Sequence, residues 1–100
     1  MSARSTDKID LESAILSRVI APDEGTLSPE AARSMLSLSF GQRDLARMNR
    51  LAAKARAGKL TSAEDDALES YLRVGRFVAL VQAKARRSLQ HATDVGADAE

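Results

Sequence analysis

Residues 71–89 read YLRVGRFVALVQAKARRSL, an almost unbroken apolar stretch between arginines. Upstream, Thr61 and Glu64 have the spacing of a capping box, in which each residue satisfies a backbone amide of the other. The stretch is therefore predicted to belong to one helix over residues 62–90. At 1.5 Å per residue this helix is about 42 Å long, which is more than a compact domain of this size requires, so we expect another surface to cover it.

A second long helix is predicted over residues 41–57. Ser39 and Gln42 have the spacing of another capping box at its start, and Gly58 can adopt the left-handed conformation that ends a helix. Because the helices over 41–57 and 62–90 follow each other closely in sequence, we expect them to form a helical hairpin.

One or two short helices are predicted before the hairpin. The first, over residues 8–20, spaces its apolar residues for burial on one side: Ile9, Leu11, Ile15, Leu16, Val19 and Ile20. A strand over residues 14–20 is the weaker alternative. Pro22 then disfavours helix at Ala21, and Gly25 permits a tight turn.

The second short helix is predicted to begin at Ser28, a good acceptor for first-turn amides, which is followed by Pro29. The expected fold is all-α: a helical hairpin preceded by one or two short helices, in a small helical bundle. Residues 8–90 form a single helical domain in this interpretation, whereas the polar ends, 1–7 and 91–100, are expected to be disordered.

The composition agrees with a helical fold. Hydrophobic residues make up 44% of the chain but aromatic residues only 3%, and alanine and leucine are abundant, as in helices. A length of 100 residues fits one compact domain. Fifteen basic and fourteen acidic residues leave a net charge of +1, which argues against a general polyanion binder.

Several classes of protein are excluded or disfavoured. The chain has no cysteine, which excludes disulfides, thiolate metal sites and cysteine nucleophiles and fits a reducing cytoplasm. No apolar run approaches the roughly 20 residues that span a bilayer, and the N-terminus is too polar for a secretory leader. We therefore expect a cytoplasmic protein without a membrane segment.

Few residues are suited to catalysis or to metal binding. His91 is the only histidine and lies in the polar C-terminal end, so histidine metal sites and Ser-His-Asp triads lack their parts. Acidic residues at 64–66 and Glu69 place carboxylates on one helical turn, but the helix dipole favours acids there without a metal. The sequence predicts no enzyme, catalytic residue, cofactor, metal site or small-molecule substrate.

The helix over 62–90 has more apolar surface than one hairpin partner covers. Two adjoining apolar strips together exceed the roughly 100° that a surface helix normally buries. One strip has heptad-like spacing, and we expect it to mediate self-association, as in a dimer, through Tyr71, Val74, Val78 and Val81.

A partner-binding site is predicted on another side of the same helix. It comprises Arg73, Arg76, Phe77 and Leu80. An aromatic side chain supplies affinity when it is buried, and arginines around it supply orientation, as in interface hot spots. In the alternative, the N-terminal helices cover Phe77 and make it part of the core. Gly75, in the middle of the helix, indicates the close approach of another helix.

The helix over 41–57 carries a basic stripe, which comprises Arg43, Arg47, Arg50 and Lys54. One interpretation is a surface for phosphate or for an acidic protein; the other is a solvated face whose charge is met by the acids at 64–69. A DNA-reading helix pair of the usual size and the aromatic platforms of RNA binders are missing. Nucleic-acid binding is therefore the alternative function and not the first.

Between residues 15 and 89, the motifs LSPEAA, KARAGKLT, YLRVG and ALVQAKARRSL occur in this order. This pattern resembles that of a group of short uncharacterised bacterial all-helical proteins, and the likeness covers most of the predicted folded part. The resemblance implies a neutralising or adaptor-like role and transfers no functional residue. Together with the patterns above, it predicts a non-catalytic protein-interaction module that binds a protein partner or a second copy of itself.

Overall fold

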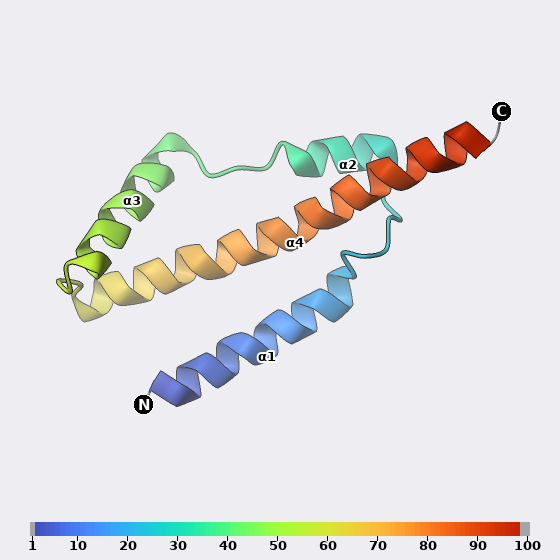
Figure 1. Cartoon of the computed structure of the whole chain (residues 1–100). Helices are drawn as coiled ribbons and strands as arrows, with labels where there is room; N and C mark the ends of the chain where they lie inside the picture. Colours follow the sequence, from blue (N-terminus) through green and yellow to red (C-terminus); the bar gives the residue numbers. More distant parts are fainter. Residues whose placement is uncertain (1, 99–100) are drawn as a thin grey trace. The chain divides into compact units, whose positions relative to one another are not determined.

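The structure is all-α, as predicted (Figure 1). The computed structural model describes the backbone of residues 2–98 and the side chains of residues 11–93. Its helices are α1 (Ser2–Ile20), α2 (Pro29–Leu36), α3 (Gln42–Arg56) and α4 (Ser62–Asp98), and no strand occurs between residues 2 and 98.

Local sequence features set the start of α2 and of α4. The Ser28 side chain accepts a hydrogen bond from the Ala31 amide at 3.2 Å, and Pro29 occupies the first turn. At α4, Thr61 Oγ1 accepts from the Glu64 amide at 3.1 Å, and Glu64 Oε1 accepts from the Thr61 amide at 3.0 Å. This reciprocal pair is the predicted capping box.

The predicted bounds of α3 are confirmed, but its predicted capping box is wrong. The N-cap residue is Gly41, in extended conformation, and no side chain caps the helix. Ser39 lies two positions too early, because a capping box requires its serine at the N-cap itself. At the other end Gly58 has φ +68, and the amide of Lys59 donates to the carbonyl of Lys54 at 2.9 Å, the bond of a Schellman motif.

The chain divides into two compact units. The first comprises Met1–Leu38 and Arg76–Glu100, and the second comprises Ser39–Gly75. Helix α4 contributes residues to both units. The single domain over residues 8–90 therefore stays a prediction.

Both terminal helices are longer than expected. Helix α1 begins at Ser2, where we expected residues 1–7 to be disordered, and α4 continues to Asp98, past the predicted end at residue 90. Once a helix is nucleated, each added residue gains one hydrogen bond at little further cost. Residues 1, 99 and 100 lie outside the described backbone, and the disorder of the two ends stays a prediction.

In the first unit, side chains of α4 hold α1 in place. Arg76 Nη1 donates to the Ser13 hydroxyl at 3.1 Å, and Lys84 Nζ donates to the Ile20 carbonyl at 2.6 Å. Both pairs advance in the same direction, so α1 runs parallel to this part of α4. The last carbonyls of a helix lack a partner inside it, and Lys84 supplies one for α1.

Helix α2 runs antiparallel to the same part of α4. Gln82 Nε2 donates to carbonyls at the end of α2, with the shortest distance, 2.7 Å, to that of Leu38. Almost two turns later on α4, the Ser88 side chain accepts from the amide of Leu27, just before α2 begins, at 3.1 Å. Three polar residues of α4, Gln82, Lys84 and Ser88, thus fix the ends of α1 and α2.

Gly25 allows the segment between α1 and α2 to touch the backbone of α4. A Cβ atom at this position would lie 2.8 Å from the Arg87 carbonyl oxygen and 3.0 Å from Ser88 Cα. The expected role of Gly25, a tight turn, is thus accompanied by close packing that the sequence did not indicate. The left-handed residue in this segment is Ala21, with φ 51, directly after α1.

In the second unit, α3 and the start of α4 form the predicted hairpin. Lys54, near the end of α3, pairs with Glu64 at 2.5 Å, and Asp44, near its start, accepts from the Tyr71 hydroxyl at 2.6 Å. The two helices are therefore antiparallel. Leu51 is the buried side chain of α3.

Candidate functional site

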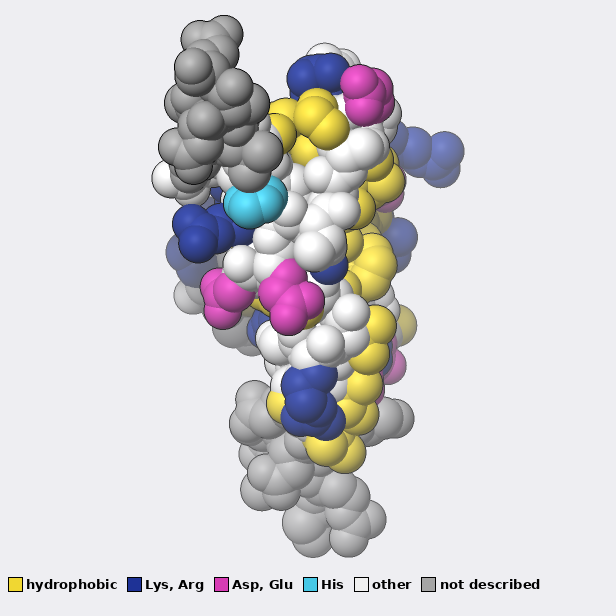
Figure 2. Space-filling model, turned by 90° about the vertical axis from the view of Figure 1, so that its right-hand side faces the viewer, with side chains coloured by type: hydrophobic (Ala, Val, Ile, Leu, Met, Phe, Trp, Pro, Cys, Tyr) yellow, Lys and Arg dark blue, Asp and Glu magenta, His cyan; other side chains and the backbone are white. Residues whose placement is uncertain are grey.

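Within residues 11–93, far more large apolar side chains are exposed than buried. The fully buried residues are Ala32, Leu51, Ala85 and Ser88. Large hydrophobic side chains that are between 42% and 75% exposed are Leu11, Ile15, Val19, Leu38, Leu45, Leu72, Val74 and Phe77. Figure 2 shows hydrophobic side chains gathered in a strip on one face, beside charged ones. Folding of the described chain thus leaves these large apolar side chains in contact with water.

The four predicted self-association residues are divided between the two units. Tyr71 and Val74 belong to the second unit, and Val78 and Val81 to the first. Val74 is 49% exposed, whereas Tyr71, Val78 and Val81 are half-buried. The Tyr71 side chain is engaged with α3 in its own unit. Val74 is therefore the most accessible member of the set.

Of the predicted partner-binding residues, Phe77 lies at the surface. Its side chain is 44% exposed, so the alternative that Phe77 is a core residue is wrong. Leu80 is half-buried, and the Arg76 guanidinium is bonded to Ser13 of α1. Arg73 is exposed and lies in the second unit. Phe77 is thus the exposed apolar side chain of this set.

Helix α1 exposes apolar residues that we expected to be buried. Leu11, Ile15 and Val19 are 60%, 42% and 75% exposed. Their spacing of four residues places them on one side of α1, away from Ser13, which contacts α4. The periodicity was compatible with burial, but the described part of the first unit offers no element to cover this side.

The second unit contains an apolar groove that we call the tyrosine groove. It has a volume of about 440 Å³ and is lined by Phe40, Asp44, Arg47, Ala67, Ser70, Tyr71 and Val74. Two of the three aromatic residues of the chain meet here: the rings of Phe40 and Tyr71 pack edge to face with centroids 5.9 Å apart. The contribution of Phe40 and Asp44 was missed, because only their distance from Tyr71 in space reveals it.

Charged groups hold the Tyr71 ring. Its hydroxyl donates to Asp44 Oδ1 at 2.6 Å, and the guanidinium carbon of Arg47 lies 5.9 Å from the ring centroid, within cation–π range. The hydrogen bond to Asp44 raises the pKa of Tyr71 above its ordinary value, because loss of the proton would remove the donor and place two negative charges together. The Tyr71 hydroxyl therefore keeps its proton and donates a hydrogen bond to Asp44.

Gly75 lies near this groove without a close helix contact. A Cβ atom at Gly75 would meet only Phe40 Cε2, at 3.9 Å, which is ordinary van der Waals contact. The close approach that we expected at Gly75 is therefore absent, and the close contact in the described chain occurs at Gly25 instead.

The basic stripe of α3 is partly neutralised. Lys54 is paired with Glu64, and this hydrogen bond is the main cause that lowers the pKa of Glu64 below its ordinary value. Arg43 and Arg50 are exposed and form no ion pair with any described residue. Two hollows follow the stripe, one lined by Arg43 and Asp44 and the other by Leu51 and Glu64, and Arg47 and Arg50 line both. Arg43, Arg47 and Arg50 therefore remain as a positively charged part of the stripe.

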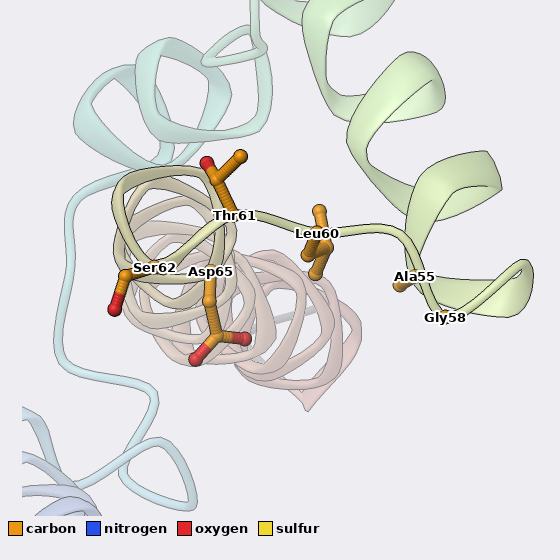
Figure 3. A pocket seen from close by; sticks show the side chains of 6 residues that line it. All are labelled: Ala55, Gly58, Leu60, Thr61, Ser62 and Asp65. Carbon is orange, nitrogen blue, oxygen red and sulfur yellow. The ribbon is translucent and has the colours of Figure 1, made fainter.

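A larger hollow lies at the connection between α3 and α4 (Figure 3). It measures about 570 Å³ and is lined by Ala55, Gly58, Leu60, Thr61, Ser62 and Asp65. The Thr61 hydroxyl already accepts the first-turn amide of α4, and Asp65 is the one carboxylate in the lining. The hollow offers neither an apolar wall of large side chains nor a cluster of charges.

Neither a metal centre nor a membrane span is found in the part of the chain that the structure describes. No group of three or more His, Cys, Asp or Glu residues there could hold a metal ion. None of the described helices combines the length and the apolar character that crossing a bilayer requires.

Comparison with known proteins gives no relative. No protein-family model matches the chain, and neither the curated proteins nor the solved structures contain a match.

Proposed function

We propose that the protein is a non-catalytic interaction module that docks a protein partner through α4. The observation that carries this proposal is that α4 exposes large apolar side chains in each unit: Phe77 in the first, and Leu72 and Val74 in the second. Burial of one such side chain stabilises a complex by about 1.5–3 kcal/mol, so the described chain leaves a large part of its apolar surface unused in folding.

The way the first unit is held together supports this proposal. Its contacts between helices include hydrogen bonds from Arg76, Gln82 and Lys84, and among its described side chains the buried apolar ones are two alanines. The larger apolar side chains are left at the surface and are available to a partner. A neutralising or adaptor-like role, as the resemblance of the sequence motifs implies, would use such a surface without chemistry.

Photo-cross-linking tests the proposal. Phe77→p-benzoylphenylalanine, expressed in the source organism, is expected to form a covalent adduct with another protein or with a second copy. The same probe at Arg86, an exposed position on α4 in the same unit, serves as the control. The probe is also placed at Val74. If neither Phe77 nor Val74 gives an adduct and the protein has a monomeric mass at all concentrations, the proposal is wrong.

Binding of nucleic acid by the basic stripe is the second candidate. The exposure of Arg43 and Arg50 without ion pairs in the described chain favours it. Affinity for duplex DNA should then fall steeply with salt, with a slope set by the number of phosphates contacted. Arg43→Glu and Arg50→Glu should reduce that slope, and a flat response to salt would exclude this function.

A further inference from the structure

We infer that the tyrosine groove binds an acidic peptide segment of a partner protein, which inserts one apolar side chain between α3 and α4. The inference rests on the proposed function, and adds to it the place of docking in the second unit and the chemistry of the partner.

The first argument is the shape and the polarity of the groove. Its volume of about 440 Å³ lies within the roughly 300–1,000 Å³ of ligand-binding pockets. Phe40, Ala67 and Val74 give it apolar walls, and Val74 is 49% exposed. An apolar side chain of a partner would cover this exposed valine, and the removal of both surfaces from water would stabilise the complex.

The second argument is that the groove is already formed. Three neighbours position the Tyr71 ring: Asp44 accepts from its hydroxyl, the Phe40 ring packs edge to face with it, and Arg47 lies over it. Because these contacts hold the Tyr71 ring within its own unit, binding would cost little ordering of side chains. Aromatic and arginine side chains in this arrangement are also those enriched in interface hot spots.

The third argument is the charge around the groove. Arg43, Arg47 and Arg50 line the hollow that adjoins it, and Asp44, the one carboxylate in either lining, already accepts a hydrogen bond from the Tyr71 hydroxyl. The rim is therefore positive, and it is complementary to carboxylates on both sides of an inserted apolar residue. An acidic segment would also be guided to the groove by this charge.

A peptide fits these observations better than nucleic acid does. Base stacking needs a free aromatic face, but the Arg47 guanidinium already lies over Tyr71, and Phe40 packs against that ring. Lys54, which would extend the track of phosphate contacts, is paired with Glu64. What remains is a short positive rim around an apolar hollow, which is the pattern of a peptide site.

Fluorescence anisotropy with defined peptide pools tests the inference. The probe is a pool of short labelled peptides with a central leucine or phenylalanine and glutamate at most other positions. One matched pool replaces glutamate by glutamine, and another replaces the central residue by alanine. The acidic apolar pool is expected to bind at least about tenfold more tightly than either matched pool, which corresponds to about 1.4 kcal/mol.

Variants of the groove locate the binding. Val74→Glu places a carboxylate in the hollow, and Arg43→Glu reverses one charge of the rim; each is expected to weaken the acidic pool about tenfold or more. Arg86→Glu changes the same charge on α4 in the first unit and should leave affinity unchanged. Circular dichroism of each variant verifies that its helix content is retained, and Tyr71→Phe, which keeps the ring, gives a second groove variant if Val74→Glu does not fold.

The outcomes separate the inference from the proposed function. The inference is overturned if the glutamine pool binds as tightly as the acidic pool. It is also overturned if a single-stranded oligonucleotide binds more tightly than the acidic pool and Val74→Glu abolishes that binding. Adducts at Phe77 without any peptide binding leave the interaction module standing and overturn the groove as its acidic-peptide site. A second copy of the chain in the groove would appear as a dimer that Val74→Glu dissociates, which also overturns the inference.

Discussion

The side-chain oxygen of Ser88 lies 3.1 Å from the backbone nitrogen of Leu27, 61 residues away in sequence, and the same hydroxyl donates to the Lys84 carbonyl at 2.7 Å. Ser88 is 1% exposed, and its hydrogen bond with the Leu27 amide is part-buried. One hydroxyl thus joins the start of α2 to α4 within the first unit.

Ser88→Ala is expected to destabilise the fold by about 1–2 kcal/mol, because it leaves a part-buried amide without an acceptor while slightly raising helix propensity. Urea unfolding followed by circular dichroism measures the change. Ser70→Ala, on the same helix, removes only a bond to its own Asp66 carbonyl and is the matched control. Equal midpoints for the two variants would contradict the role of Ser88.

Gly25→Ala is expected to destabilise the first unit by about 1–3 kcal/mol, as overpacking does when the neighbour cannot yield. The atoms that a Cβ would meet, Arg87 O at 2.8 Å and Ser88 Cα at 3.0 Å, belong to the backbone of α4 and cannot rotate away. Gly75→Ala is the contrasting substitution. Its Cβ meets only Phe40 at 3.9 Å, so improved helix propensity should stabilise the protein by about 0.5–1 kcal/mol.

Thermal unfolding of these two glycine variants gives a sharp comparison, since the same chemical change should lower the midpoint at position 25 and raise it at position 75. A lower midpoint for both would mean that Phe40 cannot tolerate the added methyl group.

Ala21→Gly is expected to stabilise the protein by about 0.5–1 kcal/mol. Ala21 has φ 51, a left-handed conformation that costs an L-residue about 1–2 kcal/mol. Glycine avoids this cost, but its greater conformational entropy in the unfolded chain offsets part of the stabilisation. Ala57→Gly is the control, because Ala57 also follows a helix directly but has φ -84. There glycine should destabilise, and a loss of stability in both variants would argue against strain at Ala21.

Features that depend on neighbouring residues could be predicted from the sequence. Ser28, Thr61 with Glu64, and Gly58 act within one helical turn, so their spacing alone reveals the helix ends. The failed capping box at Ser39 has the same spacing, but the helix begins one residue after Gly41, which leaves that serine outside the cap. Spacing therefore predicts a helix end without fixing its register.

The contacts that assemble each unit could not be predicted in this way. Lys84 reaches a carbonyl 64 residues away, and Tyr71 reaches a carboxylate 27 residues away. Nothing in the sequence around Lys84 distinguishes it from the arginines nearby, and the apolar period of α1 is compatible with either a buried or an exposed stripe. The candidate groove likewise depends on which face of α3 meets α4.

The pair formed by Lys54 and Glu64 should make stability depend on pH in the acid range. The hydrogen bond from Lys54 lowers the pKa of Glu64 in the folded protein below 4.5, its ordinary value. The contribution of this carboxylate is therefore fully present above pH 4.5, and it is lost as the pH falls through the lowered pKa.

Glu64→Gln tests this dependence, because glutamine can still accept the Thr61 amide in the capping box but carries no charge. Urea midpoints of the natural protein and the variant should differ at neutral pH and converge as the solution is acidified below pH 4.5. In a Lys54→Met background the same substitution should have little effect at either pH, and added salt should shrink the difference because both side chains face solvent. A difference that persists in acid or in that background would mean that Glu64 acts through its cap and not through its charge.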